Sequence, residues 1–299
     1  MGYSASGQQW RISAAGHEAT VVEVGGGLRE YGVGGVPLLY GYAEDEPAPS
    51  SAGAQLVPWP NRIRDGRYTF RGTARQLPLT EPKFHNASHG LARWSLWRPT
   101  AVSPDSVTLA CTVPPQSGYP FRLDASTTYT VSARGLEVSH EVTNTGVDDA
   151  PFGFGAHPYL YVPGTDTDDL VLHLPGATDR VVTDDRCLPV GREAVAGTPY
   201  DFSSPRRIGT VELDTAFAGV DGPVTLSTAD GRGVALWRDE SFPWVQVFTS
   251  DVLAEPRRRA SVAVEPMTCP ADAFNTGDGL LVLAPGESWR GRWGIGPLG

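Results

Sequence analysis

Apolar and polar residues alternate with a period of two along much of this chain. Between Leu123 and Val131, apolar side chains alternate with Asp, Ser and Thr, and the pattern resumes at Leu136 after a turn that ends at Gly135. Such alternation places apolar side chains on one face of a β-strand, so the two segments predict a hairpin. Gly or Pro interrupts nearly every candidate helix, and the best one, Ala177 to Leu188, is poor. The sequence therefore predicts an all-β chain.

Shorter copies of the alternation are spread over the rest of the chain. They lie at Val107 to Val113, Leu170 to Leu174, Val224 to Leu226, Trp244 to Phe248 and Val262 to Glu265. Many short strands with Gly/Pro turns, at intervals of roughly 8–12 residues, are typical of an antiparallel sandwich or barrel. The sequence has no repeat and no compositional break that would mark a linker. We therefore expect residues 1–299 to form one large antiparallel β-sandwich domain, with a concave face for a small ligand.

The charge balance and the cysteines narrow the possible functions. With 34 acidic and 24 basic side chains, a net charge of −10 and no basic run, the chain is not suited to nucleic acid or an anionic membrane. It has no signal-like start and no run of about 18 apolar residues, so we expect a cytoplasmic protein. Three cysteines without Cys-x-x-Cys spacing and a single lysine argue against zinc, redox and Schiff-base chemistry. We expect neither a metal nor a cofactor.

Five of the six histidines can be assigned to the core, the surface or a possible site by their sequence context, and His85 is ambiguous. His140 is in register with apolar strand positions, which favours a hydrogen-bonded histidine in the core. His17 and His173 stand among polar residues and are expected at the surface. His89 precedes a glycine, and His157 follows a glycine-rich segment. Flexible loops of this kind are where functional imidazoles are expected, so His89 and His157 are the candidates for chemistry.

Glu265 is the strongest candidate for a catalytic carboxylate. Val262 and Val264 form the apolar face of a short strand, so Glu265 points to the other face, and Pro266 is expected to end the strand pairing directly after it. If that face is concave and partly dry, desolvation brings the carboxylate toward the proton affinity of a general base near neutral pH. An exposed glutamate at a strand end is an equally good interpretation of this segment alone.

A second cluster lies at Asn61, Arg62 and Arg64, just after Trp59. An arginine fork binds two neighbouring hydroxyls or a carboxylate, and a tryptophan stacks on the apolar face of a sugar. The alternative is a surface arginine beside a packed tryptophan. No Gly-x-Ser-x-Gly motif is present, and no two histidines have metal-ligand spacing, so nucleophilic and metal sites gain little support.

Five motifs in order resemble the aldose 1-epimerase family, also called galactose mutarotases. The motifs are Asn61-Arg62-Ile63, His89-Gly90, His157-Pro158-Tyr159, Asp214 within Leu213 to Phe217, and Glu265-Pro266. The resemblance extends from about Leu56 to the C-terminus and is closest to a divergent bacterial branch. It implies the galactose mutarotase-like β-sandwich, with a sugar held on its concave face.

The resemblance also implies roles for individual side chains. Glu265 is expected to be the general base and His157 the general acid, on opposite sides of the anomeric carbon, with His89 near the ring oxygen or the anomeric hydroxyl. Opening and closing a hemiacetal requires only such positioned proton transfers, and no cofactor. The other sugar hydroxyls are expected to contact the remaining residues of the motifs and the tryptophan before them: Arg62, Asp214, Asn61, Tyr159 and Trp59.

Alternatives remain at this point. A hexose-6-phosphate 1-epimerase would need a cationic pocket, for which Arg64, Arg67 and Arg71 are candidates. A sugar-binding or sensing protein on the same fold would not turn its ligand over. Asp221 lies close enough to Asp214 in the sequence to replace it as the acidic residue. The preferred aldose is left open, as is the choice between a monomer and a homodimer.

Overall fold

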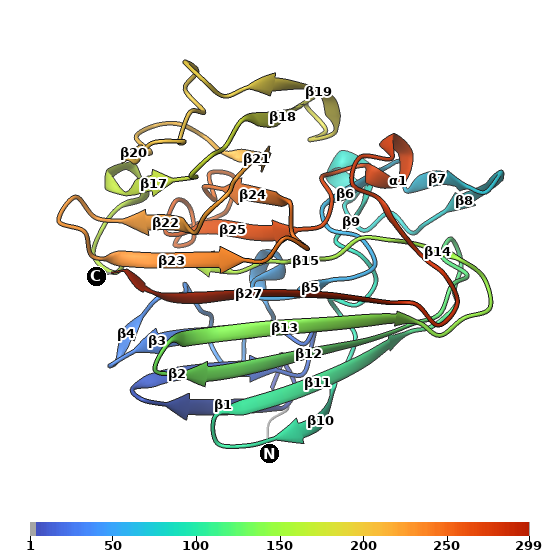
Figure 1. The fold of residues 1–299 in the computed structure, drawn as a ribbon, viewed down its shortest axis with the longest axis horizontal. Coiled ribbons are helices and arrows are strands. Elements are labelled where there is room, and N and C mark those ends of the chain that lie inside the picture. The colour runs from blue at the N-terminus through green and yellow to red at the C-terminus, as the bar shows by residue number, and fades with distance from the viewer. Residues whose placement is uncertain (1–3, 299) are drawn as a thin grey trace.

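The computed structural model describes residues 4–298, and nearly all of its regular structure is β (Figure 1). The short helices are η1 (Pro49–Ser51), η2 (Pro82–Phe84), η3 (Thr167–Asp169) and α1 (Ala273–Thr276). The strands form two large antiparallel sheets, one four-stranded sheet and three two-stranded ribbons. The predicted fold class, a large antiparallel β-sandwich of the galactose mutarotase-like type, is confirmed.

The first large sheet has nine strands and contains both the predicted hairpin and the C-terminal strand. Its order is β10 (Arg98–Val102), β11 (Ser106–Val113), β12 (Leu123–Ser132), β13 (Gly135–Asn144), β27 (Ser288–Leu298), β23 (Gly233–Arg238), β22 (Val224–Ser227), β17 (Val171–His173) and β20 (Arg206–Arg207). Buried and half-buried residues alternate without exception along β12, as the sequence pattern requires.

The second large sheet carries most of the strand residues discussed as functional candidates. Its path is β19 (Pro189–Ala194), β18 (Asp179–Thr183), β21 (Asp214–Ala218), β24 (Trp244–Phe248), β25 (Val262–Met267), β15 (Gly155–Ala156) and β5 (Gln55–Leu56), and β16 (Tyr159–Leu160) also pairs with β25. Every residue of β25 is buried, and the strand is paired along both edges, with β24 on one side and β15 and β16 on the other.

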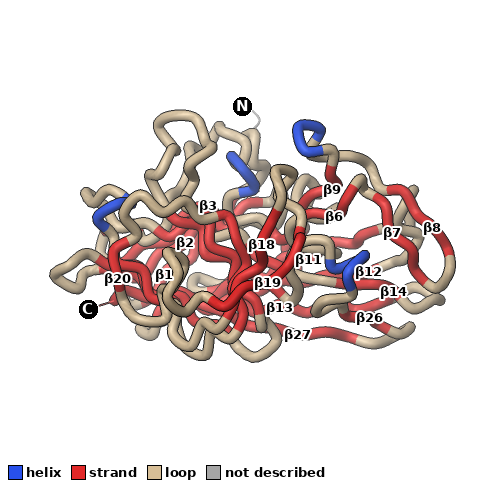
Figure 2. Tube along the Cα trace, turned by 90° about the horizontal axis from the view of Figure 1, so that it is seen from above, coloured by secondary structure: helices blue, strands red, loops and turns tan. Residues whose placement is uncertain are grey.

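Smaller sheets complete the fold around these two. The four-stranded sheet is formed by β1 (Gln9–Ala14), β2 (His17–Val22), β3 (Leu28–Val33) and β4 (Val36–Pro37), and the ribbons pair β6 (Arg62–Arg64) with β9 (Asn86–Ser88), β7 (Arg67–Phe70) with β8 (Thr73–Gln76), and β14 (Ala150–Phe152) with β26 (Leu281–Leu283). β1 and β2 contact β12. Figure 2 shows the strands crossing the centre of the molecule, with loops around its rim.

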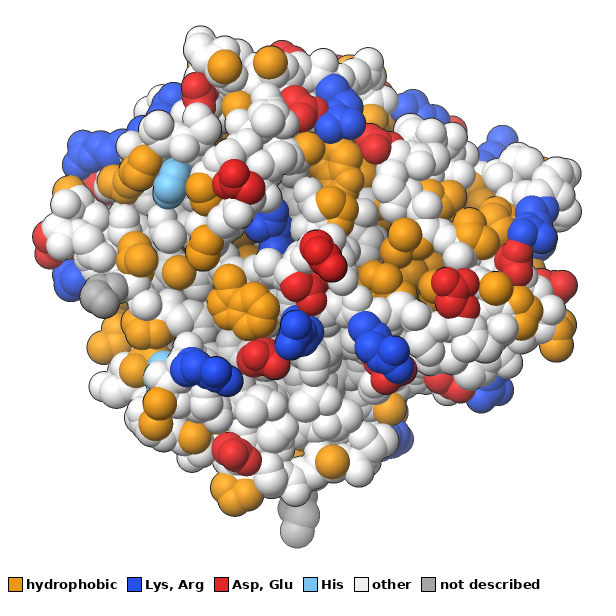
Figure 3. All heavy atoms as spheres, viewed as in Figure 1, with side chains coloured by type: hydrophobic (Ala, Val, Ile, Leu, Met, Phe, Trp, Pro, Cys, Tyr) orange, Lys and Arg blue, Asp and Glu red, His pale blue; other side chains and the backbone are white. Residues whose placement is uncertain are grey.

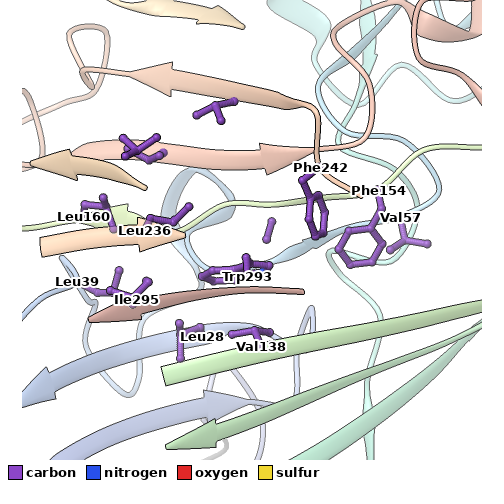
Figure 4. Packing of buried hydrophobic residues seen from close by; sticks show 14 of the residues in the cluster. Leu28, Leu39, Val57, Val138, Phe154, Leu160, Leu236, Phe242, Trp293 and Ile295 are labelled. Carbon is purple, nitrogen blue, oxygen red and sulfur yellow. The ribbon is translucent and has the colours of Figure 1, made fainter. Parts of the chain in front are cut away.

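One cluster of buried hydrophobic residues runs from Trp10 to Ile295 and is shared by the large sheets. Figure 4 shows Phe154 and Phe242 pointing into the same interior space as Trp293. The rings of Phe154 and Phe242 lie 6.2 Å apart at 63°, an edge-to-face arrangement that aromatic pairs favour. The sequence interpretation of residues 1–299 as a single domain stays a prediction.

The poor helix candidate at Ala177 to Leu188 contains the strand β18, paired with β19 and β21, which agrees with the prediction of an all-β chain. One expectation about the histidines is wrong. His17 is buried rather than exposed, since the hydroxyl of Tyr31 on the neighbouring strand lies 2.8 Å from its Nδ1 and satisfies it. His140 is in the core, as predicted.

Acidic and basic side chains are interspersed over the face shown in Figure 3, without a large patch of one sign. Within residues 4–298, no helix has the length and apolar character needed to cross a membrane.

Candidate active site

A cavity of about 300 Å³ opens where the second large sheet meets the loops that carry η1 and η2. Seven of the eight predicted site residues line it: Asn61, Arg62, His89, His157, Tyr159, Asp214 and Glu265. The volume is at the lower end of the usual range for small-molecule sites, which fits a ligand of monosaccharide size.

The register of the second large sheet brings the acidic residues to one face. Glu265 on β25 is paired with Gln246 on β24, and Gln246 is paired with Ala216 on β21. Directly opposed residues share a face, and so do residues two apart along one strand. Asp214, two residues from Ala216, therefore lies on the same face as Gln246 and Glu265. The amide of Gln246 donates a hydrogen bond to Asp214 Oδ1 at 2.6 Å, which fixes the Asp214 carboxylate.

Glu265 and His157 meet in the cavity. Glu265 Oε1 lies 3.5 Å from His157 Nε2, and the two residues are 2% and 4% exposed. The two groups are therefore adjacent. The family resemblance implied instead that they lie on opposite sides of the anomeric carbon. Pro266 does not end the strand either: β25 continues to Met267, with Pro266 paired opposite Val245. A proline removes only one amide donor, and a strand continues where that donor is not required.

His157 sits in the connection between β15 and β16, among other rings. Its imidazole stacks on Tyr159 with ring centres 5.0 Å apart at 19°, and it meets His89 edge to face at 5.4 Å. The backbone carbonyl of His157 accepts a hydrogen bond from the amide of Gly53. These contacts hold the imidazole plane in place beside Glu265.

Three buried polar atoms of this group have no hydrogen-bond partner among the described residues. They are His89 Nδ1, His157 Nδ1 and Glu265 Oε2. Buried polar groups are nearly always paired, so a cluster of unpaired ones beside a cavity is typical of a site that binds a polar ligand.

Two loop residues of the site have backbone conformations that favour few residue types. Asn61 and His89 have φ of 53° and 59°, in the left-handed region, and the amide of His89 donates to the carbonyl of Asn61. The following Gly90 also has positive φ, and a Cβ there would lie 2.1 Å from the carbonyl oxygen of Val57. Glycine is therefore required beside His89, which explains the His-Gly motif.

Arg62 is held by carboxylates in the cavity wall. Its Nε and Nη2 donate to the two oxygens of Glu81 at 2.8 and 3.0 Å, and its Nη1 lies 3.6 Å from Asp214 Oδ2. Burial alone would lower the pKa of Arg62, but the hydrogen bonds and charges of Glu81 and Asp214 outweigh it and hold the pKa above its usual range. The side chain is therefore a fixed cation at the base of the site.

The pKa values of the central pair move in opposite directions. Burial raises the pKa of Glu265 well above its ordinary value, and the charge of Asp214 adds to this against the opposing effect of Arg62. Burial also lowers the pKa of His157 to about 3, with the charges of Arg93 and Arg62 acting in the same sense. The pKa of His89 is lowered by its burial and by the charge of His157. Each shift favours the neutral form of its group.

Trp59 is the one predicted site residue that the structure removes from the cavity. It is 2% exposed and packs against Tyr119 and Phe274, with ring centres 6.4 and 5.7 Å away. The expected stacking of Trp59 on a sugar is therefore wrong, because the residue faces the core while Asn61 and Arg62 turn into the cavity.

The arginines expected to bind a phosphate also lie elsewhere. Arg64 bonds to Asp272, Arg67 to Gln76 and Arg71 to Asp149, and none of the three lines the cavity. Asp221 is likewise outside the cavity, whereas Asp214 lines it.

Several residues of the cavity were missed by sequence reasoning. Glu81, Lys83 and Arg93 line the cavity, and Gln246 supports Asp214. The only signal available was the alternation of β24, which places Gln246 opposite Glu265 once the pairing of the two strands is known. Among residues 4–298, no group of three or more His, Cys, Asp and Glu side chains is arranged to hold a metal ion. The arrangement offers a proton donor and acceptor beside fixed polar contacts, which suits acid–base chemistry.

A family model described as aldose 1-epimerase matches residues 8–295. The chain belongs to the aldose 1-epimerase family. Among curated proteins, the YihR protein of Escherichia coli (strain K12) is 34% identical over 289 residues, which cover 95% of this chain and 92% of YihR. The maltose epimerase of Levilactobacillus brevis is 29% identical over 255 residues, covering 75% of this chain and 72% of that enzyme.

Solved structures agree with this membership at the level of the fold. The GalM/aldose epimerase homologue from C. elegans superposes with a TM-score of 0.86 at 19% identity, covering 98% of this chain and 99% of that one. As an aldose 1-epimerase family member, the chain is an enzyme of the epimerase class.

Proposed function

We propose that this enzyme interconverts the α and β anomers of a free aldose such as glucose or galactose. The observation that carries the proposal is the contact of 3.5 Å between the Glu265 carboxylate and the His157 imidazole, inside a cavity that is also lined by Arg62, His89 and Asp214. Membership of the aldose 1-epimerase family supports the reaction.

Ring opening transfers two protons at neighbouring oxygens. Glu265 removes the proton of the hydroxyl on C1, and His157 delivers a proton to the ring oxygen, so the bond between C1 and the ring oxygen breaks and an aldehyde forms. Rotation about C1–C2 presents the other carbonyl face, and the reverse transfers close the ring as the other anomer. Both oxygens are bonded to one carbon, so two groups side by side reach them. Each transfer contributes typically about 10²–10⁴-fold.

Burial favours the protonation state that follows ring opening over the ionised pair from which the step starts. Before it, Glu265 is a carboxylate and His157 an imidazolium; after it, the proton is on Glu265 and both groups are neutral. Because burial raises the pKa of Glu265 and lowers that of His157, the cavity favours the neutral pair, which is the state that accompanies the open-chain sugar.

The remaining hydroxyls are bound by the polar wall of the cavity. Arg62 and Asp214 are held in place by Glu81 and Gln246, so they offer a donor and an acceptor at fixed positions. Fixed partners lower the entropy that is lost when a sugar binds. His89 lies beside His157 and is assigned to the ring oxygen or the anomeric hydroxyl, with Asn61 and Tyr159 as further contacts.

Polarimetry of freshly dissolved α-D-glucose and α-D-galactose tests the proposal. The wild-type enzyme is expected to speed the approach to equilibrium rotation, and Glu265→Gln to abolish the acceleration, because the amide accepts no proton. The exposed Glu240 lies outside the cavity, so Glu240→Gln serves as the matched control and is expected to match the wild type. Equal rates for wild type and Glu265→Gln would overturn the assignment of the base, and sugar binding without acceleration would favour a sensing protein.

A further inference from the structure

Arg93 is a cation on the cavity wall without a counter-charge. It lies within 4.0 Å of no carboxylate among residues 4–298, whereas Arg62 in the same cavity has two. Its Nη1 donates to the neutral Ser51 hydroxyl at 3.0 Å, and its Nε is buried without an acceptor. Glu81 acts on Arg93 only at longer range, because both its carboxylate oxygens are bonded to Arg62.

Lys83 is a second uncompensated cation in the same cavity. It is the only lysine of the chain, lies in η2, and sits 4.9 Å from the ring centre of Phe84. No carboxylate lies within 4.0 Å of its ammonium in the part of the chain that the structure describes. The cavity is lined by three cations, Arg62, Arg93 and Lys83, and the carboxylates of Glu81 and Asp214 both contact Arg62. Because burial favours the neutral form of Glu265, one positive charge is left in excess.

The local excess of cations runs against the composition of the whole protein. The chain carries a net charge of −10, so its overall field repels anions, yet two cations of its cavity have no carboxylate within 4.0 Å among residues 4–298. A partly buried guanidinium whose Nε lacks an acceptor costs free energy that a neutral sugar recovers only in part, while an oxyanion supplies both charge and acceptors. A protein can retain a buried cation of this kind when a bound ligand supplies the opposite charge.

From this imbalance we infer that the preferred substrate is an aldose bearing an anionic group, a carboxylate, phosphate or sulfo group, which Arg93 binds and Lys83 attracts at the mouth of the cavity. The inference rests on the proposed epimerase activity and names its substrate class. It replaces the predicted phosphate pocket at Arg64, Arg67 and Arg71, which lie outside the cavity.

Arg93 is close enough to the reacting pair to couple the anion to catalysis. Arg93 donates a hydrogen bond to the Ser51 hydroxyl. Gly53, two residues after Ser51, donates its amide to the backbone carbonyl of His157, so one short segment contacts both residues. The charge of Arg93 contributes to the low pKa values of His157 and His89. A bound anion offsets that charge and so favours the imidazolium that delivers a proton to the ring oxygen.

The test compares one neutral and three anionic aldoses that share a ring: glucose, glucuronate, glucose 6-phosphate and glucose 6-sulfate. Anomer exchange is measured by NMR, with the uncatalysed rate subtracted, for wild type, Arg93→Met, Arg93→Lys and Lys83→Met. Arg134 is exposed in the turn between β12 and β13 and does not line the cavity, so Arg134→Met is the matched control. The three anionic sugars distinguish the possible sources of the charge.

We expect kcat/KM of the wild type to be at least about 10-fold higher for one of the anionic sugars than for glucose. Arg93→Met is expected to remove most of that preference, Arg93→Lys to restore part of it, and Lys83→Met to reduce it less while weakening its salt dependence. A wild type that prefers glucose overturns the inference without any variant, as does an Arg93→Met enzyme that loses equally on all four sugars. If no aldose is turned over by the wild type, the proposed function itself fails.

Discussion

Two buried histidines of this protein share a lowered pKa but differ in how their ring nitrogens are satisfied. Burial lowers the pKa of both His140 and His157 to about 3. In the core, Trp293 Nε1 donates to His140 Nε2 at 2.8 Å, which leaves Nδ1 as the donor to the Thr127 hydroxyl at 3.0 Å. At the cavity, His157 Nδ1 has no hydrogen-bond partner within residues 4–298, and its Nε2 faces Glu265.

The difference between the two regions shows which property distinguishes a candidate functional histidine from a structural one. A lowered pKa does not, because burial lowers the pKa of both histidines. Unmet hydrogen-bonding capacity beside a cavity belongs to His157 alone of the two, because the core around His140 satisfies each ring nitrogen. Replacing His157 should therefore impair turnover, and replacing His140 should impair stability. The opposite pattern would contradict this distinction.

Replacing His157 gives the largest expected effect. His157→Asn removes the group that transfers a proton to the ring oxygen, so kcat for anomer exchange should fall by about 10²–10⁴-fold, with a smaller change in KM. The melting temperature should stay close to that of the wild type. The substitution breaks no existing hydrogen bond of the His157 ring, whose Nδ1 has no partner among the described residues. Steady-state polarimetry over a range of sugar concentrations separates the two constants, and an unchanged kcat would contradict the role.

Replacing His140 should give the opposite result. His140→Leu leaves the buried Trp293 and Thr127 polar groups without partners, and each such loss costs about 1–3 kcal/mol. We expect urea unfolding to show a free energy of unfolding lower by about 2–4 kcal/mol, while kcat stays within about twofold. A variant of unchanged stability but impaired turnover would remove the distinction between the two histidines.

The pH profile sharpens the comparison further. The reacting pair must carry one proton in total, and it gains a second only when the neutral His157 is protonated, at a pKa of about 3. An unperturbed histidine protonates near pH 6.5, so we expect kcat/KM to change less than about twofold between pH 7 and pH 5. Loss of activity is expected on the alkaline side, as Glu265 gives up its proton. A limb centred near pH 6.5 would show that His157 titrates as an exposed imidazole does.

Trp59 provides the smallest expected effect. Since its ring packs against Tyr119 and Phe274 and its Nε1 has no partner among the described residues, Trp59→Phe removes an unpaired buried donor and some packing. We expect KM and kcat within about twofold of the wild type and a change in unfolding free energy below about 2 kcal/mol. A tenfold rise in KM would restore the stacking role that the sequence suggested.

Much of the site was predictable, and the errors have a common cause. The motifs around His89, His157 and Glu265 named residues that meet in one cavity. Trp59 and Arg62 are close neighbours in the sequence, yet one faces the core and the other the cavity, and no local pattern distinguishes those directions. Arg93 could not be predicted, because whether an arginine has a carboxylate partner depends on residues that are distant in the sequence.

The strands and the available chemical groups can be read from the residues alone, because alternation is a local property of neighbouring residues. Which of those groups meet depends on how distant strands pair. Glu265 and His157 are separated by more than one hundred residues, and their contact depends on how β25 pairs with β24, β15 and β16. Register between distant strands is set by packing over the whole sandwich, so no single segment contains it.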